Sequence, residues 1–155
     1  MAIKSFQGKR DTNQPKKADD FLVRDYMTTK LITFKPEQRI EEVIDILLKF
    51  KISGGPVVND KNELIGVISE GDCMRQISDS RYYNMPIDNE QIVENAMAKD
   101  VDTIDGDMNI LDAANAFLES KRRRFPILKD GKLVGQISQK DVLRAAIQLR
   151  GNTWK

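Results

Sequence analysis

The chain has no histidine and a single cysteine, Cys73. Without histidine it cannot build a Ser-His-Asp or Cys-His catalytic arrangement, nor a zinc or haem site with histidine ligands. A lone cysteine cannot close a disulfide within the chain, and such cysteine usage is typical of a reducing compartment. For catalysis this leaves only Asp, Glu, Lys, Tyr and Cys73. We expect no catalytic residues and no metal site.

Long apolar runs and an excess of either charge are also missing. The longest apolar runs are only a few residues long, such as Ile46-Leu47-Leu48. A transmembrane helix needs about 20 apolar residues. The N-terminal residues 1–5 lack the apolar core of a signal peptide, which predicts a cytoplasmic protein. Lys plus Arg number 25 against 24 Asp plus Glu, a net charge of +1. This balance gives no bulk attraction to a membrane or to nucleic acid, and we expect neither as a partner.

What is present suits a globular fold. The 155 residues are 40% apolar and 32% charged, enough for one compact domain or two small interlocked halves. Residues 1–20 are polar, carry several basic residues and lack hydrophobic periodicity, so they predict a disordered basic tail. A nucleic-acid-binding arm is the alternative interpretation of the tail, and the near-neutral net charge disfavours it.

From residue 23 the sequence repeats itself. Residues recur first at an offset of 70 and, after one residue is dropped near Lys61, at an offset of 69. The matched pairs include Met27 with Met97, Thr33 with Thr103, Pro56 with Pro126, Gly66 with Gly135, Asp72 with Asp141 and Arg75 with Arg144. Turn residues and apolar positions both match, so the pattern indicates a duplication, with repeats at 21–85 and 86–150.

Each repeat predicts the same β-α-β-β-α order. A short strand at 32–34, or around Thr103-Ile104, precedes a helix with an apolar stripe. The stripe residues are Ile40, Val43, Ile44, Leu47 and Leu48 in one repeat and Ile110, Ala113, Ala114, Phe117 and Leu118 in the other. Two strands around a polar turn follow, and a final helix begins after Ser69 or Ser138. The predicted fold class is α/β (α+β-like): two tandem units packed sheet against sheet with pseudo-twofold symmetry, because one unit alone would bury too little apolar surface.

The sharpest motif is a serine followed three residues later by an aspartate, Ser69 with Asp72 and Ser138 with Asp141. One interpretation is a helix cap, because both side chains can satisfy the first free amides of the helix. The other is a ligand site, because a carboxylate accepts hydrogen bonds from the two hydroxyls of a ribose and a helix N-terminus favours phosphate. The sequence leaves both open.

A second cluster precedes the middle strands and differs between the repeats. The first repeat has Ser53-Gly54-Gly55-Pro56, where the missing side chains let a ligand or a neighbouring backbone come close. The second has Arg122-Arg123-Arg124-Phe125-Pro126, with Lys140 next to Asp141. These cations predict either a phosphate site or a solvated helix end. Cys73 matches the apolar Val142, which predicts a packing role for it.

Together these residues resemble the CBS domain, a family named after cystathionine β-synthase. The resemblance covers 23–149 and rests on the Met27-Thr28 and Met97-Ala98 openings, the segments Gly-Gly-Pro-Val-Val and Arg-Phe-Pro-Ile-Leu, and the endings Leu-x-Gly-x-Ile-Ser-x-x-Asp. It implies a stand-alone pair that binds AMP, ADP, ATP or S-adenosylmethionine in clefts between the repeats, dimerises and regulates a partner protein, with no required cofactor.

The resemblance also implies site residues. The aspartates would hold ribose, the threonines and the backbone before the middle strand would hold adenine, and basic groups would hold phosphate. The ligand-binding residues are then Thr33, Gly54, Gly55, Pro56, Val57, Ser69 and Asp72 in one repeat and Thr103, Arg123, Arg124, Phe125, Pro126, Ile127, Ser138, Lys140 and Asp141 in the other. Gly71 replaces a basic residue of the family, which weakens phosphate binding by the first repeat.

Three other functions compete with a ligand sensor. The chain could be a structural dimerisation module with empty clefts, since capping also explains the two aspartates. An enzyme such as a nucleotide dehydrogenase is disfavoured because the chain has no histidine and no room for a catalytic barrel. Nucleic-acid binding through the tail and Arg122–Arg124 is disfavoured by the net charge. For a homodimer, the predicted interface residues are Leu143, Ala146, Ile147 and Leu149, with Met74 and Ile77 in the matching helix.

Overall fold

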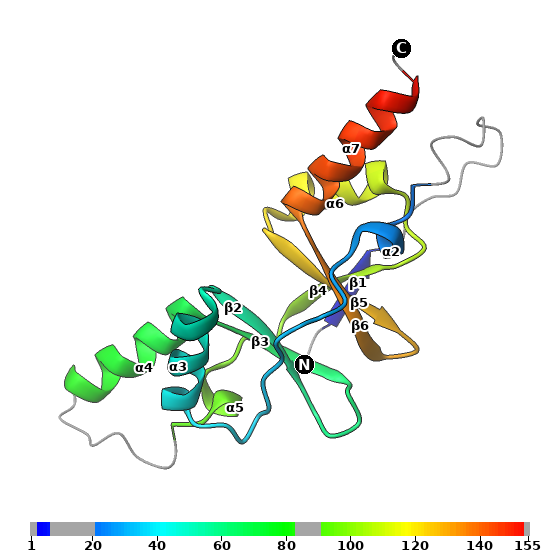
Figure 1. Cartoon of the computed structure of the whole chain (residues 1–155). Helices are drawn as coiled ribbons and strands as arrows, with labels where there is room; N and C mark the ends of the chain where they lie inside the picture. Colours follow the sequence, from blue (N-terminus) through cyan, green and yellow to red (C-terminus); the bar gives the residue numbers. More distant parts are fainter. Residues whose placement is uncertain (1–2, 7–20, 83–90, 154–155) are drawn as a thin grey trace. The chain divides into compact units, whose positions relative to one another are not determined.

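The structure is a computed structural model that describes residues 3–6, 21–82 and 91–153 (Figure 1). The described residues form two compact units. Unit 1 runs from Ile32 to Val101 and takes in Ile3, and unit 2 joins the residues between Lys4 and Leu31 to those from Asp102 onward. Both units mix helices and strands, which confirms the predicted class with two repeated α/β units.

Unit 1 is built on a two-stranded antiparallel sheet. Its elements are α3 (Ile40–Phe50), β2 (Gly54–Val58), β3 (Leu64–Ser69), α4 (Glu70–Tyr82) and α5 (Val93–Ala96). The predicted helical stripe is confirmed at Ile40, Val43 and Leu47, which are buried in the core with the fully buried Phe34. Leu48 was placed in the same stripe, but it is 73% exposed and lies on the outer face of α3.

Unit 2 has a four-stranded sheet in the order β1-β4-β5-β6. Its elements are β1 (Ile3–Phe6), α2 (Val23–Tyr26), β4 (Val101–Asp105), α6 (Ile110–Ser120), β5 (Arg124–Lys129), β6 (Lys132–Ser138) and α7 (Gln139–Thr153). Strand β4 pairs parallel with β5, and β5 pairs antiparallel with β6. The β5–β6 turn has Asp130 at φ 54° and Gly131 at φ 80°, which is the two-residue turn that suits the twist of a hairpin.

The two units exchange the segments that open the sequence repeats. The segment 22–28 comes just before the first repeat's helix, yet its Val23 is fully buried in the core of unit 2. Thr28 of the same segment pairs with Gln136 at the edge of β6. This segment therefore completes the unit that is formed mainly by the second repeat.

The segment 92–98 shows the reciprocal arrangement. Val93 is fully buried in the core of unit 1, and Ala98 pairs with Val67 at the edge of β3. The repeat boundaries 21–85 and 86–150 stay a prediction about the duplication, because the compact units are divided at other residues. Residues 83–90, around the predicted boundary, lie outside the described residues.

Two details of the predicted secondary structure need correction. The tail 1–20 was predicted to be disordered, but Ile3–Phe6 form β1, where the half-buried ring of Phe6 packs against Phe125. Residues 7–20 lie outside the described residues. The strand predicted at 32–34 is reduced to one bridge between Phe34 and Val57, whereas its counterpart β4 is longer than predicted.

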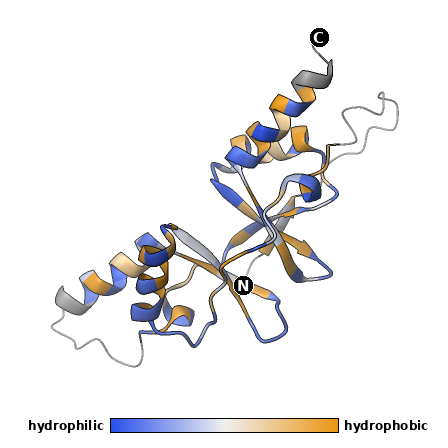
Figure 2. Ribbon diagram, in the orientation of Figure 1, coloured by the Kyte–Doolittle hydropathy of each residue, from blue (hydrophilic) through white to orange (hydrophobic). Residues whose placement is uncertain are grey.

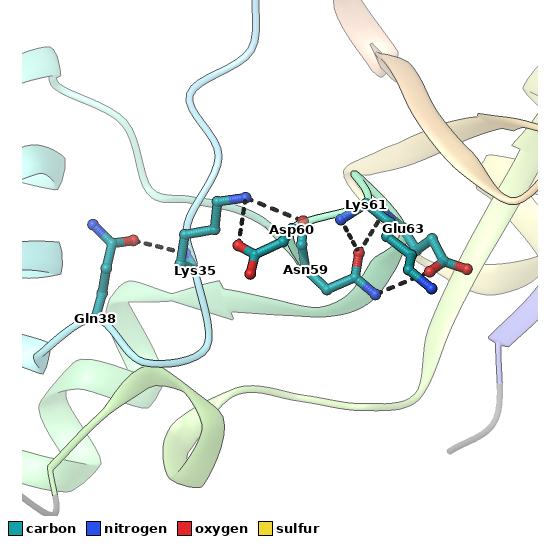
Figure 3. A network of polar contacts seen from close by, with 6 residues as sticks. All are labelled: Lys35, Gln38, Asn59, Asp60, Lys61 and Glu63. Carbon is teal, nitrogen blue, oxygen red and sulfur yellow. Dashed lines mark hydrogen bonds and ion pairs between the residues drawn. The ribbon is translucent and has the colours of Figure 1, made fainter.

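A polar network holds the segment around Lys35 in unit 1 (Figure 3). The Lys35 side chain donates to the backbone carbonyl of Asn59 at 3.1 Å, and its backbone amide donates to Gln38 Oε1 at 2.7 Å. The amide oxygen of Asn59 in turn accepts from the backbone of Lys61 and Glu63, at 3.0 and 2.9 Å. The turn between β2 and β3 is thus ordered by its own side chains and tied to residue 35.

Candidate ligand-binding site

Each unit places a buried aspartate in the first turn of its last helix. In unit 1, Asp72 Oδ2 accepts hydrogen bonds from the backbone amide and hydroxyl of Ser69, at 2.9 and 3.0 Å. The amide of Asp72 donates back to the Ser69 hydroxyl at 3.4 Å. Asp72 Oδ1 accepts a hydrogen bond from the guanidinium of Arg75. This is a reciprocal helix cap, which contributes about 1 kcal/mol to stability.

Unit 2 reproduces the same contacts around Asp141. Its Oδ2 accepts from the backbone amide and hydroxyl of Ser138, at 2.9 and 3.0 Å, and its Oδ1 accepts from Arg144 at 2.9 Å. Asp141 is 6% exposed, whereas the side chain of Arg144 is 70% exposed. The cap itself is buried, and the arginine that bonds it from outside lies in solvent, where an ion pair adds little stability.

These contacts limit what the aspartates can bind. A carboxylate offers about four lone-pair positions, and the cap and the arginine use three of them. A ribose diol needs two acceptor positions, so its binding to Asp141 requires Arg144 to move away from Oδ1. The exposed arginine can do so, whereas the bonds from the backbone amide and the hydroxyl of Ser138 form the cap of the helix. The ribose role of Asp72 and Asp141 stays a prediction, and their capping role is present in the structure.

The glycines at the start of β2 serve packing. A side-chain carbon on Gly54 would lie 2.4 Å from the carbonyl oxygen of Ile68 on β3. One on Gly55 would lie 2.9 Å from the carbonyl oxygen of Ile32 and 3.0 Å from the ring of Phe34. The neighbour that approaches these glycines is therefore the unit's own backbone and core, as one of the two sequence interpretations expected.

The basic cluster of unit 2 lies beside the start of α7. The backbone amide of Gln139 donates to the carbonyl of Arg123 at 3.3 Å, so Arg123 adjoins the helix turn that carries Lys140. Arg123 and Lys140 are exposed and Arg124 is half-buried. Arg122 is different, because its guanidinium bonds Asp102 at 3.1 Å. Two exposed cations thus adjoin the N-terminus of α7, which is a favourable place for an anion.

In unit 1 the corresponding corner, where the residues before β2 meet the start of α4, has the opposite charge. The amide of Glu70 donates to the carbonyl of Ser53 at 2.9 Å, which is the same backbone contact. The residues matching Arg123 and Lys140 are Ser53 and Gly71, and the exposed Glu70 matches Gln139. The two corners share their backbone geometry, but only the corner in unit 2 has charges that suit a phosphate.

The predicted adenine-binding residues lie inside the sheets. Thr103 is fully buried on β4, and Thr33 is half-buried beside the bridge of unit 1. Phe125, Pro126 and Ile127 are buried on β5, as are Pro56 and Val57 on β2. These residues can therefore meet a ligand through their backbone groups, with Thr33 as the most accessible side chain among them.

Sequence reasoning missed two residues of this site, Arg75 and Arg144. Both stand three positions after the aspartate, and both recur at the repeat offset. Charged partners three residues apart lie on the same face of a helix, so the spacing was a usable signal.

Cys73 is buried, and burial raises the pKa of its thiol, with Asp72 and Glu70 adding to the effect. The protonated thiol is the favoured form, which agrees with the predicted packing role. Within residues 3–6, 21–82 and 91–153, no group of three possible ligands could hold a metal ion, and no helix is long and apolar enough to cross a membrane.

Comparison with known proteins gives a family match. The CBS domain model matches residues 23–79 and 93–148, one match in each repeat. The uncharacterized protein MJ1225 of Methanocaldococcus jannaschii is 32% identical over 132 residues, which cover 85% of this chain and 44% of that protein. The chain therefore spans less than half the length of this relative.

A solved structure and an enzyme also match. CBSX2 of Arabidopsis thaliana, crystallised in complex with AMP, is 30% identical with a TM-score of 0.73, covering 84% of this chain and 98% of that one. Inosine-5'-monophosphate dehydrogenase of Aquifex aeolicus is 35% identical over 114 residues, or 73% of this chain. That match covers only 22% of the enzyme, so it is confined to a part of it.

Proposed function

Because this chain belongs to the CBS domain family, with two such domains in tandem, we propose that it is a regulatory protein that binds an adenine nucleotide and acts through a protein partner. The observation that carries the proposal is the AMP complex of CBSX2, a relative of the same fold and 30% identity. AMP, ADP, ATP and S-adenosylmethionine are the candidate ligands. The ligand causes a response only through its differential affinity for two states of the protein or its complex.

The corner of unit 2 is the proposed nucleotide site. The exposed Arg123 and Lys140 beside the N-terminus of α7 support phosphate binding there, because charge-assisted bonds from several donors converge. Asp141 would accept from the ribose once Arg144 moves aside. The backbone of Phe125–Ile127 and Thr103 would contact the adenine. Unit 1 offers the same backbone with Thr33, Gly54–Val57, Ser69 and Asp72, and its corner should prefer uncharged adenosyl groups.

We test the nucleotide site by calorimetry with AMP, ADP, ATP, S-adenosylmethionine and adenosine. Asp141→Ala should weaken AMP binding at least tenfold while costing about 1 kcal/mol of stability. Asp72→Ala is the matched control, since it removes the same cap from unit 1. If both variants bind AMP like the wild type, the aspartates are caps only.

Phosphate recognition needs a second pair of variants. The double variant Arg123→Ala, Arg124→Ala should lose most of the preference for AMP over adenosine. Lys129→Ala with Lys132→Ala removes the same charge at the opposite end of the β5–β6 hairpin and should preserve that preference. A preference that survives the arginine variant undiminished would show that these arginines are a solvated helix end.

The proposed assembly is a homodimer. On the last two helices of unit 2, Leu118 is 78%, Leu143 63% and Ile147 71% exposed, and Met74 and Ile77 are exposed on α4. The apolar residues along α4 and α7 are coloured orange in Figure 2. Light scattering should give the mass of a dimer at micromolar concentration, and Leu143→Asp with Ile147→Asp should give a monomer. A monomeric wild type would contradict the assembly.

The capping role of the two aspartates also supports a second function, a structural dimerisation module. Both aspartates already act as helix caps, so a structural dimerisation module without a ligand explains the same motif. The ligand titrations separate the two functions. A ligand at about 100 times its dissociation constant should add about 2.7 kcal/mol to the free energy of unfolding, and a chain that responds to none of the five compounds is a dimerisation module.

A further inference from the structure

The N-terminal strand β1 joins the four-stranded sheet, and its residues 4–6 belong to unit 2. Among the described residues, the two-stranded sheet of unit 1 has no counterpart to it. Strand β1 is the outer strand of the four-stranded sheet and lies next to β4 (Figure 1). The segment that matches β4 is 31–35, of which residues 32–35 belong to unit 1, and its strand pairing is the single bridge between Phe34 and Val57. The two matched segments therefore differ in what lies beside them.

Their own sequences do not account for this outcome. Residues 31–35 read Leu-Ile-Thr-Phe-Lys, rich in residues that favour strands, whereas residues 101–105 read Val-Asp-Thr-Ile-Asp, with two residues that disfavour them. Yet 101–105 form a strand of five residues and 31–35 do not. Local preference does not explain the difference, and pairing with β1 does, because it places β4 inside the sheet.

An aromatic contact fixes β1 to this sheet. The ring of Phe6 lies edge-on to the ring of Phe125, with centroids 5.6 Å apart, and Phe125 also contacts Phe117 at 4.6 Å. The residue of unit 1 that matches Phe125 is Gly55, where the ring of Phe34 already fills the space. The chain thus has a ring for β1 to bind in unit 2 and none at the matching position of unit 1.

We propose that Phe6 and strand β1 position the residues of the proposed nucleotide site in unit 2. The N-terminal segment thereby sets the ligand affinity of this unit. The inference rests on the proposed function, because the strands that β1 holds carry Thr103 and the backbone of Phe125–Ile127. Phe6 acts through β4 and β5 and is a positioning residue. Whatever detaches β1 lowers the affinity of unit 2 and leaves unit 1 unchanged.

The expected effect is about tenfold in affinity, or about 1.4 kcal/mol. This equals the cost of ordering the backbone of about one residue, which a ligand would have to supply once β4 becomes as loosely held as 31–35. The effect should appear as a larger dissociation constant for AMP and as faster hydrogen exchange of the β4 amides without ligand.

The experiment compares three variants with the wild type. Phe6→Ala removes the ring, Phe6→Tyr keeps it, and Phe21→Ala removes a different half-buried ring of unit 2, one stacked on Tyr26 at 6.0 Å. Phe6→Ala should weaken AMP binding about tenfold and speed exchange at 101–105, with 54–58 unchanged. Phe6→Tyr and Phe21→Ala should stay within about twofold of the wild type in AMP affinity.

The outcomes separate the two claims. If Phe6→Ala speeds exchange but leaves AMP affinity unchanged, or changes affinity no more than Phe21→Ala does, the positioning role is wrong. If the wild type binds none of the adenosyl ligands, the proposed function is wrong and the role in ligand affinity falls with it. Exchange at 101–105 then decides alone whether β1 orders β4.

Discussion

Units 1 and 2 carry the same motifs at the same offset, but they stabilise the segment before their helix in different ways. Before the helix of unit 1, the segment 31–35 is held at its end by Lys35, whose side chain donates to the carbonyl of Asn59 in the turn after β2 (Figure 3). In unit 2 the matching segment is the strand β4, held along its length by β1 and β5. Duplicated sequences can thus keep their caps and hairpins identical while the neighbours of one strand change its structure.

The corners beside the last helices differ in charge rather than in backbone. Both corners have the same cap and the same amide-to-carbonyl contact between helix and preceding loop. Unit 2 adds exposed Arg123 and Lys140, whereas unit 1 has Ser53 and Gly71 at the matching positions and an exposed Glu70. The two corners thus share one backbone frame, and their different charges would give the two units different ligands.

The largest effect is expected from the central aromatic residue of each unit. Phe34→Ala and Phe125→Ala should each cost about 3 to 5 kcal/mol of unfolding free energy, since both rings are fully buried. Phe125→Ala should also speed hydrogen exchange in β1, because Phe6 loses its contact. Denaturant unfolding with exchange mass spectrometry measures both. Equal exchange of β1 in the two variants would contradict the aromatic attachment of β1.

Next in size is a test of the exchanged opening segments. Val93→Ala should cost about 2 kcal/mol and speed exchange in β2 and β3, although residue 93 belongs to the second repeat of the sequence. Val23→Ala is the matched variant and should speed exchange in β5 and β6 instead. Each variant perturbing its own sequence repeat would show that the segments are not exchanged.

The caps should respond equally in the two units. Ser69→Ala and Ser138→Ala each remove the hydroxyl that bonds the aspartate and the helix amide, so each should cost about 1 kcal/mol. Thermal unfolding of both variants against the wild type checks this. If only one of the two variants loses stability, the two caps contribute differently to the free energy of unfolding despite their matching geometry.

The smallest effect concerns Cys73, whose counterpart in unit 2 is Val142. Because the pKa of the thiol is raised in the folded state, its contribution to stability is complete below the unfolded pKa and is lost as the pH rises toward the folded pKa. Cys73→Val should change stability by less than about 1 kcal/mol at pH 7 and remove this loss at alkaline pH. Alkylation of Cys73 in the native chain should be slow, and rapid alkylation near neutral pH would contradict its burial.

Much of the fold was predictable because the signals were local or repeated. The helical stripes, the polar turns and the serine–aspartate caps each depend on residues within a few positions, and the duplication let one repeat confirm the other. The nucleotide site was less accessible to prediction. The motif could not show whether Asp72 and Asp141 had acceptor positions left, since this depends on how Arg75 and Arg144 lie.

The sequence by itself determined the repeat, the helix-strand-strand-helix order in each copy and the caps, because hydrogen bonds between near neighbours and apolar periodicity depend on short segments. Tertiary structure alone decided that β1 joins the sheet of unit 2, that 101–105 become a strand while 31–35 do not, and that each opening segment completes the other repeat. These outcomes depend on which distant backbone edges and rings meet. The contact of the half-buried Phe6 with Phe125 and the pairing of β1 with β4 are not encoded in the local preference of the chain.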